Sequence, residues 1–138
     1  MEKPLRIVLQ ESDDGIRSYL TKVIEADSRF VLMRSYKSFH AMLLTEPVEA
    51  EVDIVLINWQ YPYTLLNKLN TSKNNTRPSY IVTFDFVQPD FLICLEKINI
   101  RFFLIKPFLT DDLLQLQHFL AEHPFLQYHA ENLRLMGT

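Results

Sequence analysis

Five short apolar runs alternate along this chain with segments in which apolar residues recur at helical spacing. The runs are residues 5–9, 30–33, 54–59, 80–84 and 102–105. Short, largely apolar runs are typical of strands buried on both faces, and their alternation with helices is typical of βαβ units. A length of 138 residues fits one domain. From the alternation of strands and helices we predict an α/β fold with a doubly wound, five-stranded parallel sheet.

The first two predicted helices have clear starting signals. Apolar residues at positions 16, 20, 23 and 24 form one helical stripe, and the capping candidates Ser12, Asp13 and Asp14 precede it. Acidic residues in a first turn also interact favourably with the helix dipole. Ser38 is placed to open a second helix before the apolar residues at 39, 42 and 43.

The remaining helical segments are less sharply bounded. A third helix is expected around residues 65–69, and the polar stretch 70–76 behind it indicates a surface loop. A fourth is marked by apolar residues at 91, 92, 95 and 98, and Asn99 is a suitable residue for its end. A fifth begins near residues 110–112.

Composition excludes several classes of protein. Hydrophobic residues make up 48% of the chain and charged residues 22%, as in an ordinary globular domain, and a net charge of −3 gives no broad surface for nucleic acid. Neither a secretory signal nor a membrane span is apparent, so we expect a cytoplasmic protein. Cys94 is the only cysteine, which excludes intrachain disulfides and cysteine-based zinc sites. We expect no cofactor.

Polar residues follow four of the predicted strands at their carboxyl ends. In open parallel sheets, ligands bind beyond these ends, so the residues there are the candidates for function. They are Glu11, Ser12 and Asp13 after the first strand, Asn58 after the third, Thr83 near the end of the fourth, and Lys106 after the fifth.

These residues stand in sequence patterns that resemble the receiver domain of two-component response regulators. The patterns are Ile-Val-Leu-Gln-Glu-Ser-Asp at 7–13, Val-Asp-Ile-Val-Leu-Ile-Asn at 52–58, Thr83, and Phe-Leu-Ile-Lys-Pro-Phe at 103–108. Each alone is weak, but their order and intervals are specific. The resemblance covers residues 5–121 and implies a flavodoxin-like (βα)5 fold with strand order 2-1-3-4-5. It also implies a separate C-terminal extension at 122–138, either a short helix or the start of a linker.

The resemblance also assigns roles, which this chain matches only in part. In the family, an acidic pair and a phospho-accepting aspartate hold Mg²⁺, while a threonine or serine and a lysine contact the phosphoryl group. Glu11 matches the first acid, and Thr83 and Lys106 fit their positions, as Phe103 fits that of the family's switch aromatic. Ser12, however, replaces the second acid, and Asn58 replaces the phospho-acceptor. An amide cannot act as the nucleophile that forms an acyl phosphate.

The two lost carboxylates also weaken any magnesium site. Two unit charges about 4 Å apart interact by roughly 4 kcal/mol at an effective dielectric near 20, so losing two anionic ligands removes several kcal/mol of attraction. We therefore expect no proper metal site, with only weak residual Mg²⁺ binding at Glu11 and Asp13. A structural alternative is that Glu11, Asp13 and Asp14 simply form the acidic start of the first helix. Lys106 would then pair with Glu11, and Thr83 would be an ordinary strand residue.

The loop after the third strand is unusually aromatic, with Trp59, Tyr61 and Tyr63 around Pro62. Exposed aromatic residues are frequent interface anchors. They also fill space efficiently, so they could equally occupy a pocket that metal and phosphate have vacated. Both interpretations stay open from the sequence.

The sequence therefore favours a pseudo-receiver: a signalling module, not an enzyme, fixed in one state and not phosphorylated at Asn58. We expect it to form a homodimer through the face made by helix 4, strand 5 and helix 5. It would act on another signalling protein or an effector domain, in signal transduction or transcription control, without binding nucleic acid itself. Two alternatives remain. One is an ordinary phosphorelay receiver carrying an Asp-to-Asn change at residue 58, and the other is a flavodoxin-like protein that binds a small ligand.

Overall fold

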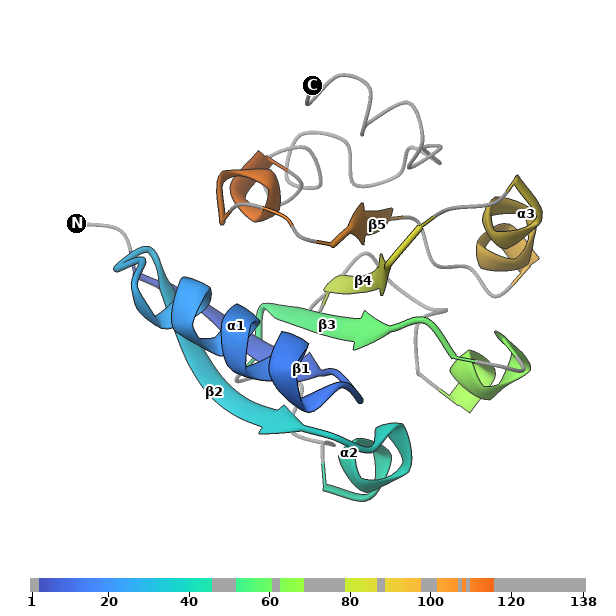
Figure 1. The fold of residues 1–138 in the computed structure, drawn as a ribbon, viewed down its shortest axis with the longest axis horizontal. Helices are drawn as coiled ribbons and strands as arrows, with labels where there is room; N and C mark the ends of the chain where they lie inside the picture. The colour runs from blue at the N-terminus through green and yellow to red at the C-terminus, as the bar shows by residue number, and fades with distance from the viewer. Residues whose placement is uncertain are drawn as a thin grey trace. The chain divides into compact units, whose positions relative to one another are not determined.

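The five apolar runs form five strands, and helical segments separate them in the computed structural model (Figure 1). The structure describes residues 3–45, 52–60, 63–68, 79–86, 89–97, 102–106, 108 and 110–115. The elements in chain order are β1 (Leu5–Gln10), α1 (Asp14–Glu25), β2 (Phe30–Tyr36), α2 (Phe39–Thr45), β3 (Ile54–Asn58), η2 (Tyr63–Lys68), β4 (Ser79–Phe84), α3 (Pro89–Lys97) and β5 (Phe102–Ile105). Residues 110–115 are also helical.

The strands form one sheet in the order β2-β1-β3-β4-β5. The ladders of β1 with β2, β1 with β3, and β4 with β5 are all parallel. The predicted flavodoxin-like class and strand order are therefore confirmed. The described residues divide into two compact units: an N-terminal unit up to Asn58 together with Ser79 and Tyr80, and a C-terminal unit with the rest.

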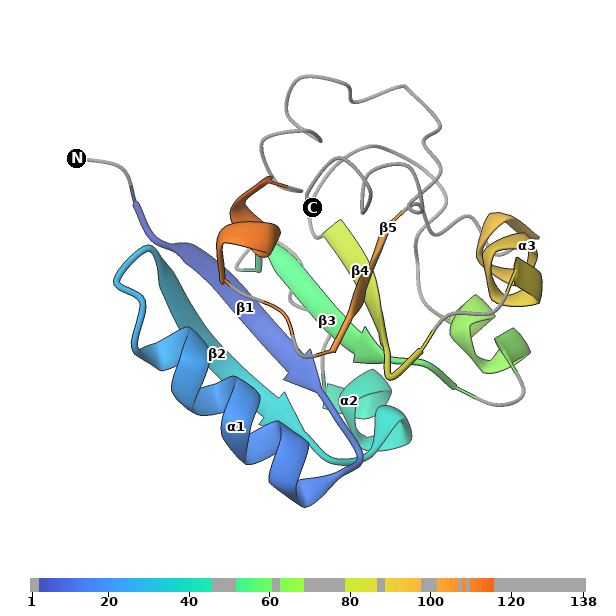
Figure 2. The same cartoon turned by 45° about the horizontal axis from the view of Figure 1, so that its top comes forward.

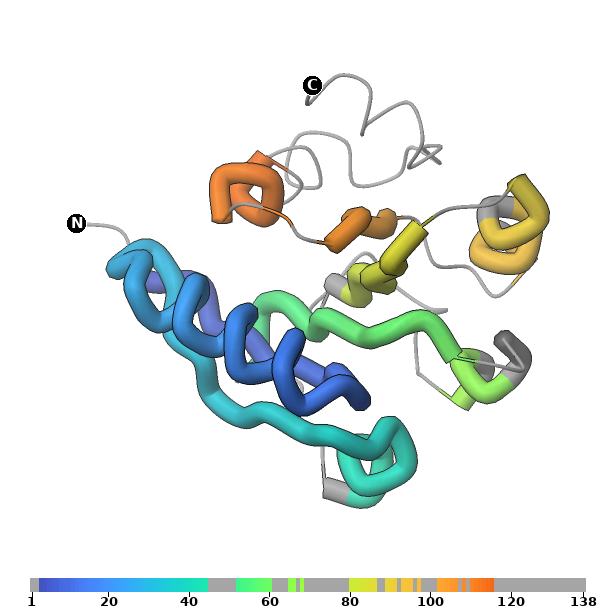
Figure 3. The backbone as a smooth tube through the Cα atoms, viewed as in Figure 1, coloured from blue at the N-terminus to red at the C-terminus, as the bar shows by residue number. Residues whose placement is uncertain are grey.

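In the N-terminal unit, β1 lies between β2 and β3 and is buried on both faces. Ile7 is in register with Leu32 of β2 and with Ile54 of β3. The next pair is Val8 with Arg34, so Met33 is an extra residue that forms a bulge in β2. Bulges bend a strand and make it a poorer template for pairing with other chains. Figure 3 shows β2 curving along its length.

Helix α1 forms where its capping signal predicts. Asp13 has extended backbone angles, and its Oδ1 accepts a hydrogen bond from the Ile16 backbone N–H at 2.9 Å. Asp13 is thus the N-cap among the three candidates. Leu20 and Ile24, one turn apart, are buried. Figures 1 and 2 both show α1 lying along β1 and β2.

Helix α2 also begins as predicted. The Ser38 hydroxyl accepts from the Ala41 backbone N–H at 3.1 Å, and its carbonyl accepts from the Met42 N–H at 3.1 Å. Phe39 and Met42 are buried, while Leu44 is largely exposed. A serine side chain at this position therefore satisfies one of the donors that the first turn leaves open.

In the C-terminal unit, β4 and β5 pair in parallel from Ile81 with Phe102 to Phe84 with Ile105. Residues 81–84 of β4 and 102–104 of β5 are buried, and so are three leucines of the helical segments in the same unit. The leucines are Leu66, Leu95 and Leu113. The third predicted helix forms as a 3₁₀ helix, η2. Six residues with one fully buried leucine suit this tighter helix, which usually occurs in short pieces.

Several predictions fall on residues outside the described part of the chain. These are the loop at 70–76, the helix end at Asn99, Tyr61 and Pro62 of the aromatic loop, and the extension at 122–138. Among the described residues, the longest helix is α1 with 12 residues, and none is long and apolar enough to cross a membrane. A membrane-spanning helix needs about 20 residues.

Candidate functional site

Asn58 and Ser12, the two residues that depart from the receiver pattern, contact each other in the N-terminal unit. The Asn58 Nδ2 donates a hydrogen bond to the Ser12 Oγ at 3.0 Å. Both groups are uncharged. Carboxylates at the same two positions would repel each other and would need a cation between them. The hydrogen bond therefore allows these two side chains to lie together without a metal ion.

The Gln10 side chain bonds to the backbone of two neighbouring strand ends beside this pair. Gln10 is only 1% exposed, and its side-chain Oε1 accepts a hydrogen bond from the Asn58 backbone N–H at 3.2 Å. Its Nε2 donates to the Lys37 carbonyl at 3.0 Å. One amide thus links the ends of β1, β3 and β2. Sequence reasoning missed this role, although an amide that follows three buried apolar residues was a usable signal, since buried polar groups are nearly always hydrogen-bonded.

The acidic residues after β1 serve the backbone of the turn and of α1. Glu11 is 1% exposed, and its Oε2 accepts from the Asp13 backbone N–H at 3.0 Å. Asp13 in turn caps α1 through the Ile16 N–H. These contacts support the structural alternative for both carboxylates. Among the described residues, no group of three or more His, Cys, Asp or Glu side chains could hold a metal ion.

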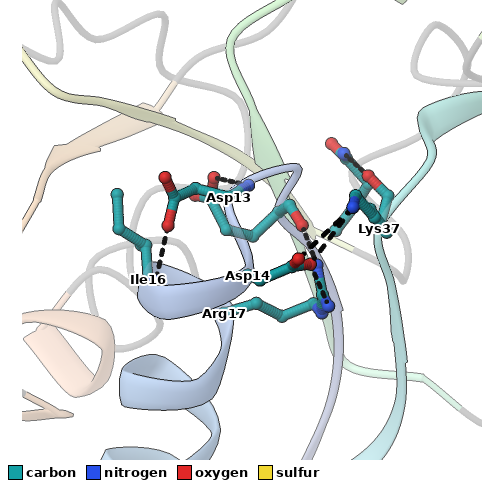
Figure 4. A network of polar contacts seen from close by, with 7 residues as sticks. Asp13, Asp14, Ile16, Arg17 and Lys37 are labelled. Carbon is teal, nitrogen blue, oxygen red and sulfur yellow. Dashed lines mark hydrogen bonds and ion pairs between the residues drawn. The ribbon is translucent and has the colours of Figure 1, made fainter.

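Asp14 lies at the centre of a charged network beside this turn (Figure 4). Its carboxylate contacts the Arg17 Nη2 at 2.8 Å and the Lys37 Nζ at 3.3 Å, while Arg17 Nη1 donates to the Glu11 carbonyl at 2.9 Å. The hydrogen bond from Arg17, followed by that from Lys37, lowers the pKa of Asp14 below its ordinary value. The network joins the start of α1 to the end of β2, and sequence reasoning did not anticipate it.

In the C-terminal unit, Lys106 forms an ion pair with Asp85. The Lys106 side chain is only 5% exposed, whereas that of Asp85 is 68% exposed, and the Nζ lies 3.3 Å from Oδ1. The Lys106 backbone N–H also donates to the Phe84 carbonyl at 2.7 Å. Sequence reasoning missed Asp85. The available signal was its place directly after β4, because neighbouring parallel strands end at the same edge.

Thr83 occupies a buried position in β4 of the same unit. It is 1% exposed, and its carbonyl accepts from the Trp59 backbone N–H at 3.0 Å. The contact ties the start of the aromatic loop to β4. It involves the threonine backbone, so it places Thr83 at the strand end without assigning a function to the hydroxyl.

Aromatic rings form a continuous cluster around Phe84, which is buried in β4. Phe103 meets it edge-on at 5.5 Å between ring centroids, and Phe91 stacks on it at 5.3 Å. Trp59 lies 5.0 Å from Phe84 and 4.9 Å from Phe91. Trp59 is therefore held by packing, which favours the space-filling interpretation for this member of the loop. Phe103 is almost completely buried, as expected for a ring without a hydroxyl group.

The predicted site residues therefore fall into two groups. Ser12 and Asn58 contact each other, with Glu11 and Asp13 joined in the adjacent turn. Thr83, Phe103 and Lys106 belong to the C-terminal unit. The amide at position 58 has no nucleophilic carboxylate oxygen, so it cannot carry out the phosphoryl chemistry of an aspartate.

Comparison with known proteins is informative at the level of structure only. No protein-family model matches this sequence, and no curated protein matches it significantly. One similar structure is the CheX–CheY–BeF3–Mg²⁺ complex from Borrelia burgdorferi, with 14% sequence identity and a TM-score of 0.65 over 86% of this chain and 89% of that chain. The isolated REC domain of RcsB from Salmonella enterica serovar Typhimurium has 14% identity and a TM-score of 0.69, over 83% and 89%.

A third similar structure is the complex of the CheA3 P1 domain with CheY6 from R. sphaeroides. The match has 13% identity and a TM-score of 0.65, over 88% of this chain and 99% of that chain. At such identities a structural likeness is evidence for architecture. The chain therefore has the flavodoxin-like fold that these CheY-like structures share.

Proposed function

We propose that this protein is a receiver-like signalling module that is not phosphorylated at residue 58 and acts by binding other proteins. The observation that carries the proposal is the hydrogen bond between Asn58 and Ser12. Both side chains of this contact are neutral. A receiver needs anionic side chains at these two positions to hold Mg²⁺ and to accept a phosphoryl group. On this proposal the protein is not an enzyme.

The ion pair of Lys106 supports a fixed state of the molecule. In the family that the sequence resembles, the matching lysine binds the phosphoryl group. Here the Asp85 carboxylate already lies 3.3 Å from the Lys106 Nζ. An ammonium group that is 95% buried needs an anionic partner, and Asp85 supplies one within the chain. We propose that the Asp85 carboxylate binds the Lys106 ammonium group in place of a phosphoryl oxygen.

The packing of Phe103 supports the same state. A switch residue has to move between two positions of similar free energy. Phe103 is buried and makes an edge-on contact with Phe84, which itself stacks on Phe91. Moving the ring outward would expose it to water and break this contact, so the inward position is strongly favoured.

The proposed partners are a second copy of the chain and another signalling protein or effector domain in the cytoplasm. Structures of the same fold include CheY6 with the CheA3 P1 domain, and a DNA-binding response regulator of the LuxR family from Staphylococcus aureus. They support signal transduction and transcription control as settings. On this proposal residues 1–121 form the receiver-like part, residues 122–138 form an extension, and the part itself does not bind nucleic acid.

The test is phosphorylation by acetyl phosphate and Mg²⁺, followed by intact-mass measurement. The wild-type chain should gain no stable phosphoryl group. The double variant Ser12→Asp, Asn58→Asp is the matched control, because it restores both lost carboxylates, and it should gain one. Phosphorylation of the wild type would refute the proposal. Phosphorylation of Asn58→Asp alone, at the level of the double variant, would favour the ordinary phosphorelay receiver instead.

A further inference from the structure

Three aromatic residues form a ridge on the C-terminal unit, where β4 ends and α3 begins. The Phe91 ring lies between the other two, with its centroid 4.9 Å from that of Trp59 and 6.3 Å from that of Phe86. Phe86 is 61% exposed, and Trp59 and Phe91 are half-buried. We call these three residues the aromatic ridge. Scattered exposed apolar residues need no explanation, but a contiguous apolar surface is typical of an interaction site.

The buried core of the unit holds the ridge in place. Trp59 and Phe91 both contact the buried ring of Phe84, at 5.0 and 5.3 Å between centroids. The Trp59 backbone N–H also donates to the Thr83 carbonyl at 3.0 Å. Side chains that are already ordered lose little conformational entropy when a partner binds. The ridge is therefore suited to anchor an interface, in which aromatic residues are generally enriched.

The rings of the ridge contact one another, so a ligand has to lie across them. Centroid distances of 4.9 and 6.3 Å are those of aromatic rings in contact. Sites for small molecules are concave and surround most of the ligand, and aromatic cages leave a space between their rings for the cation. The ridge therefore suits an extended segment of a protein better than a small molecule.

Two carboxylates flank the ridge. Asp85 directly precedes Phe86, and its side chain is 68% exposed. Asp90 directly precedes Phe91, is also exposed, and makes no hydrogen bond or ion pair with the residues that the structure describes. Asp85 already pairs with Lys106, so Asp90 is the carboxylate that is open to a partner. A partner that complements this surface presents a cation beside an apolar group.

We infer that the aromatic ridge is the docking surface for a segment of a different protein, one that carries arginine or lysine next to an apolar side chain. The apolar side chain covers Phe86, and the cation pairs with Asp90. Arginine fits best, because its planar guanidinium group stacks on aromatic rings and binds a carboxylate through two N–H groups. The inference rests on the proposed function, since it names the chemistry of the partner on which such a module would act.

The same carboxylates disfavour two other kinds of occupant. Single-stranded nucleic acids stack their bases on aromatic residues, but they do so in positively charged grooves. Anionic membrane surfaces likewise attract basic segments. Asp85 and Asp90 would repel the phosphate groups of both, and the net charge of −3 on the whole chain acts in the same direction. A basic protein segment is therefore the occupant that this surface favours.

The test is an NMR titration of the full chain with a short synthetic peptide in which arginine and leucine alternate. The peptide should shift the backbone amide signals of Phe86, Asp90 and Phe91. It should also change the fluorescence of Trp59, the only tryptophan. A second peptide with glutamate in place of arginine should bind at least about tenfold more weakly, because like charges then face each other. Raising the ionic strength should weaken binding of the arginine peptide.

Variants of the ridge and of its flanking acid assign the contacts. Phe86→Ala removes the most exposed ring and should weaken binding at least about tenfold. Asp90→Lys should weaken it by a similar factor, because it repels the arginine side chains.

Two further variants are matched controls, and both should bind within about twofold of the wild type. Ile93→Ala also removes an exposed apolar side chain, but Ile93 lies about 200° around α3 from Phe91. Glu25→Lys makes the same change of charge as Asp90→Lys, at an exposed position of α1. Thermal unfolding of each variant checks that it folds.

Several outcomes would overturn the inference. One is an absence of shifts at the ridge with about 1 mM peptide. Another is binding that Phe86→Ala and Asp90→Lys leave unchanged, since the peptide would then bind elsewhere. Ridge signals that shift with protein concentration alone, and that stop doing so in Phe86→Ala, would show that a second copy of the chain covers the ridge instead.

These outcomes are independent of the test of the proposed function. A ridge that binds no peptide would leave the acetyl phosphate result untouched. Phosphorylation of the wild type would refute the proposed function, whether or not the arginine peptide binds.

Discussion

At the scale of single residues, the most informative contact joins Asn58 to Ser12. The sequence shows two separate departures from the receiver pattern, 46 positions apart, and the structure shows that they are neighbours. An amide and a hydroxyl can share a hydrogen bond without any cation, whereas two carboxylates cannot. The two departures are therefore physically linked. A chain with an aspartate at only one of the two positions would place a single negative charge beside a neutral hydrogen-bond donor.

Replacing Gln10 should destabilise the N-terminal unit. Gln10→Leu keeps the size of the side chain but leaves the Asn58 N–H and the Lys37 carbonyl without this partner. We expect a loss of about 2 kcal/mol in the free energy of unfolding, because each part-buried polar group loses a hydrogen bond. Urea denaturation measures it. Gln115→Leu is the matched control, since Gln115 is exposed and the change there should be close to neutral.

The pKa of Asp14 should respond to its two basic neighbours. The Arg17 and Lys37 contacts lower this pKa in the folded protein. Asp14 therefore stabilises the folded state at pH values above the pKa that its carboxyl group has in the unfolded chain. This contribution disappears as the pH falls through the lower pKa of Asp14 in the folded protein. Because the Asp14 side chain is mostly exposed, salt should reduce the effect.

An NMR titration of the Asp14 side-chain carboxyl measures this pKa directly. Arg17→Gln should raise it more than Lys37→Gln does, because the Arg17 hydrogen bond is the larger cause. An Asp14 that titrates at its ordinary value in the wild type would show that the network of Figure 4 does not persist in solution.

At the scale of elements, capping and ring packing hold the two units' helices and strands in place. Helix α1 starts at a side-chain cap, and its Leu20 and Ile24 are buried one turn apart. Strand β4 is held instead by the rings that surround Phe84. The same chain therefore uses directional hydrogen bonds at a helix end and non-directional burial in a strand.

Removing the cap of α1 should weaken that helix. In Asp13→Ala, the Ile16 N–H loses its acceptor, and we expect a loss of about 1 kcal/mol in unfolding free energy. Asp13→Asn keeps an acceptor oxygen and should retain most of the stability. Thermal unfolding followed by circular dichroism compares the two. Equal losses in both variants would indicate that the charge, and not the hydrogen bond, is what matters at this position.

Truncating Phe84 should disrupt the aromatic cluster. Phe84→Ala removes a ring that is 1% exposed and contacts three others, so we expect a loss of about 3 to 5 kcal/mol. Trp59 is the only tryptophan, and its fluorescence should shift because it loses a neighbouring ring. Phe86→Ala, two residues on, is the control: its ring is mostly exposed, so the same substitution should change stability and fluorescence little.

At the scale of the whole molecule, the chain has the fold of CheY-like structures, with an amide side chain at residue 58. A sheet of this order depends on buried apolar strands, and these are kept. A module of this kind would signal through its surfaces.

Magnesium should therefore not stabilise the wild-type molecule. A ligand that binds only the folded state raises its stability with concentration. We expect millimolar Mg²⁺ to shift the wild-type Tm by less than about 1 °C. In the Ser12→Asp, Asn58→Asp variant, a tenfold excess over the dissociation constant would add about 1.4 kcal/mol, or roughly 3 to 5 °C. Differential scanning fluorimetry measures both, and a similar shift in the wild type would contradict the expected loss of the metal site.

The sequence by itself determined which segments form strands and helices and how they alternate along the chain. Runs such as residues 54–57 are apolar at every position, which is a local signal for a strand buried on both faces, and Asp13 and Ser38 carry their capping signal in their own side chains. The exception is η2, where the sequence predicted a helix without its type. Short helical segments have too few residues for their periodicity to distinguish the two forms.

The tertiary structure alone decided which side chains are partners. The contacts of Asn58 with Ser12, of Gln10 with Lys37, and of Lys106 with Asp85 join residues that are 21 to 46 positions apart, over distances of 3.0 to 3.3 Å. No periodicity in the chain encodes such a pairing. It depends on the register of neighbouring strands and on where each strand ends, and only the folded sheet fixes both.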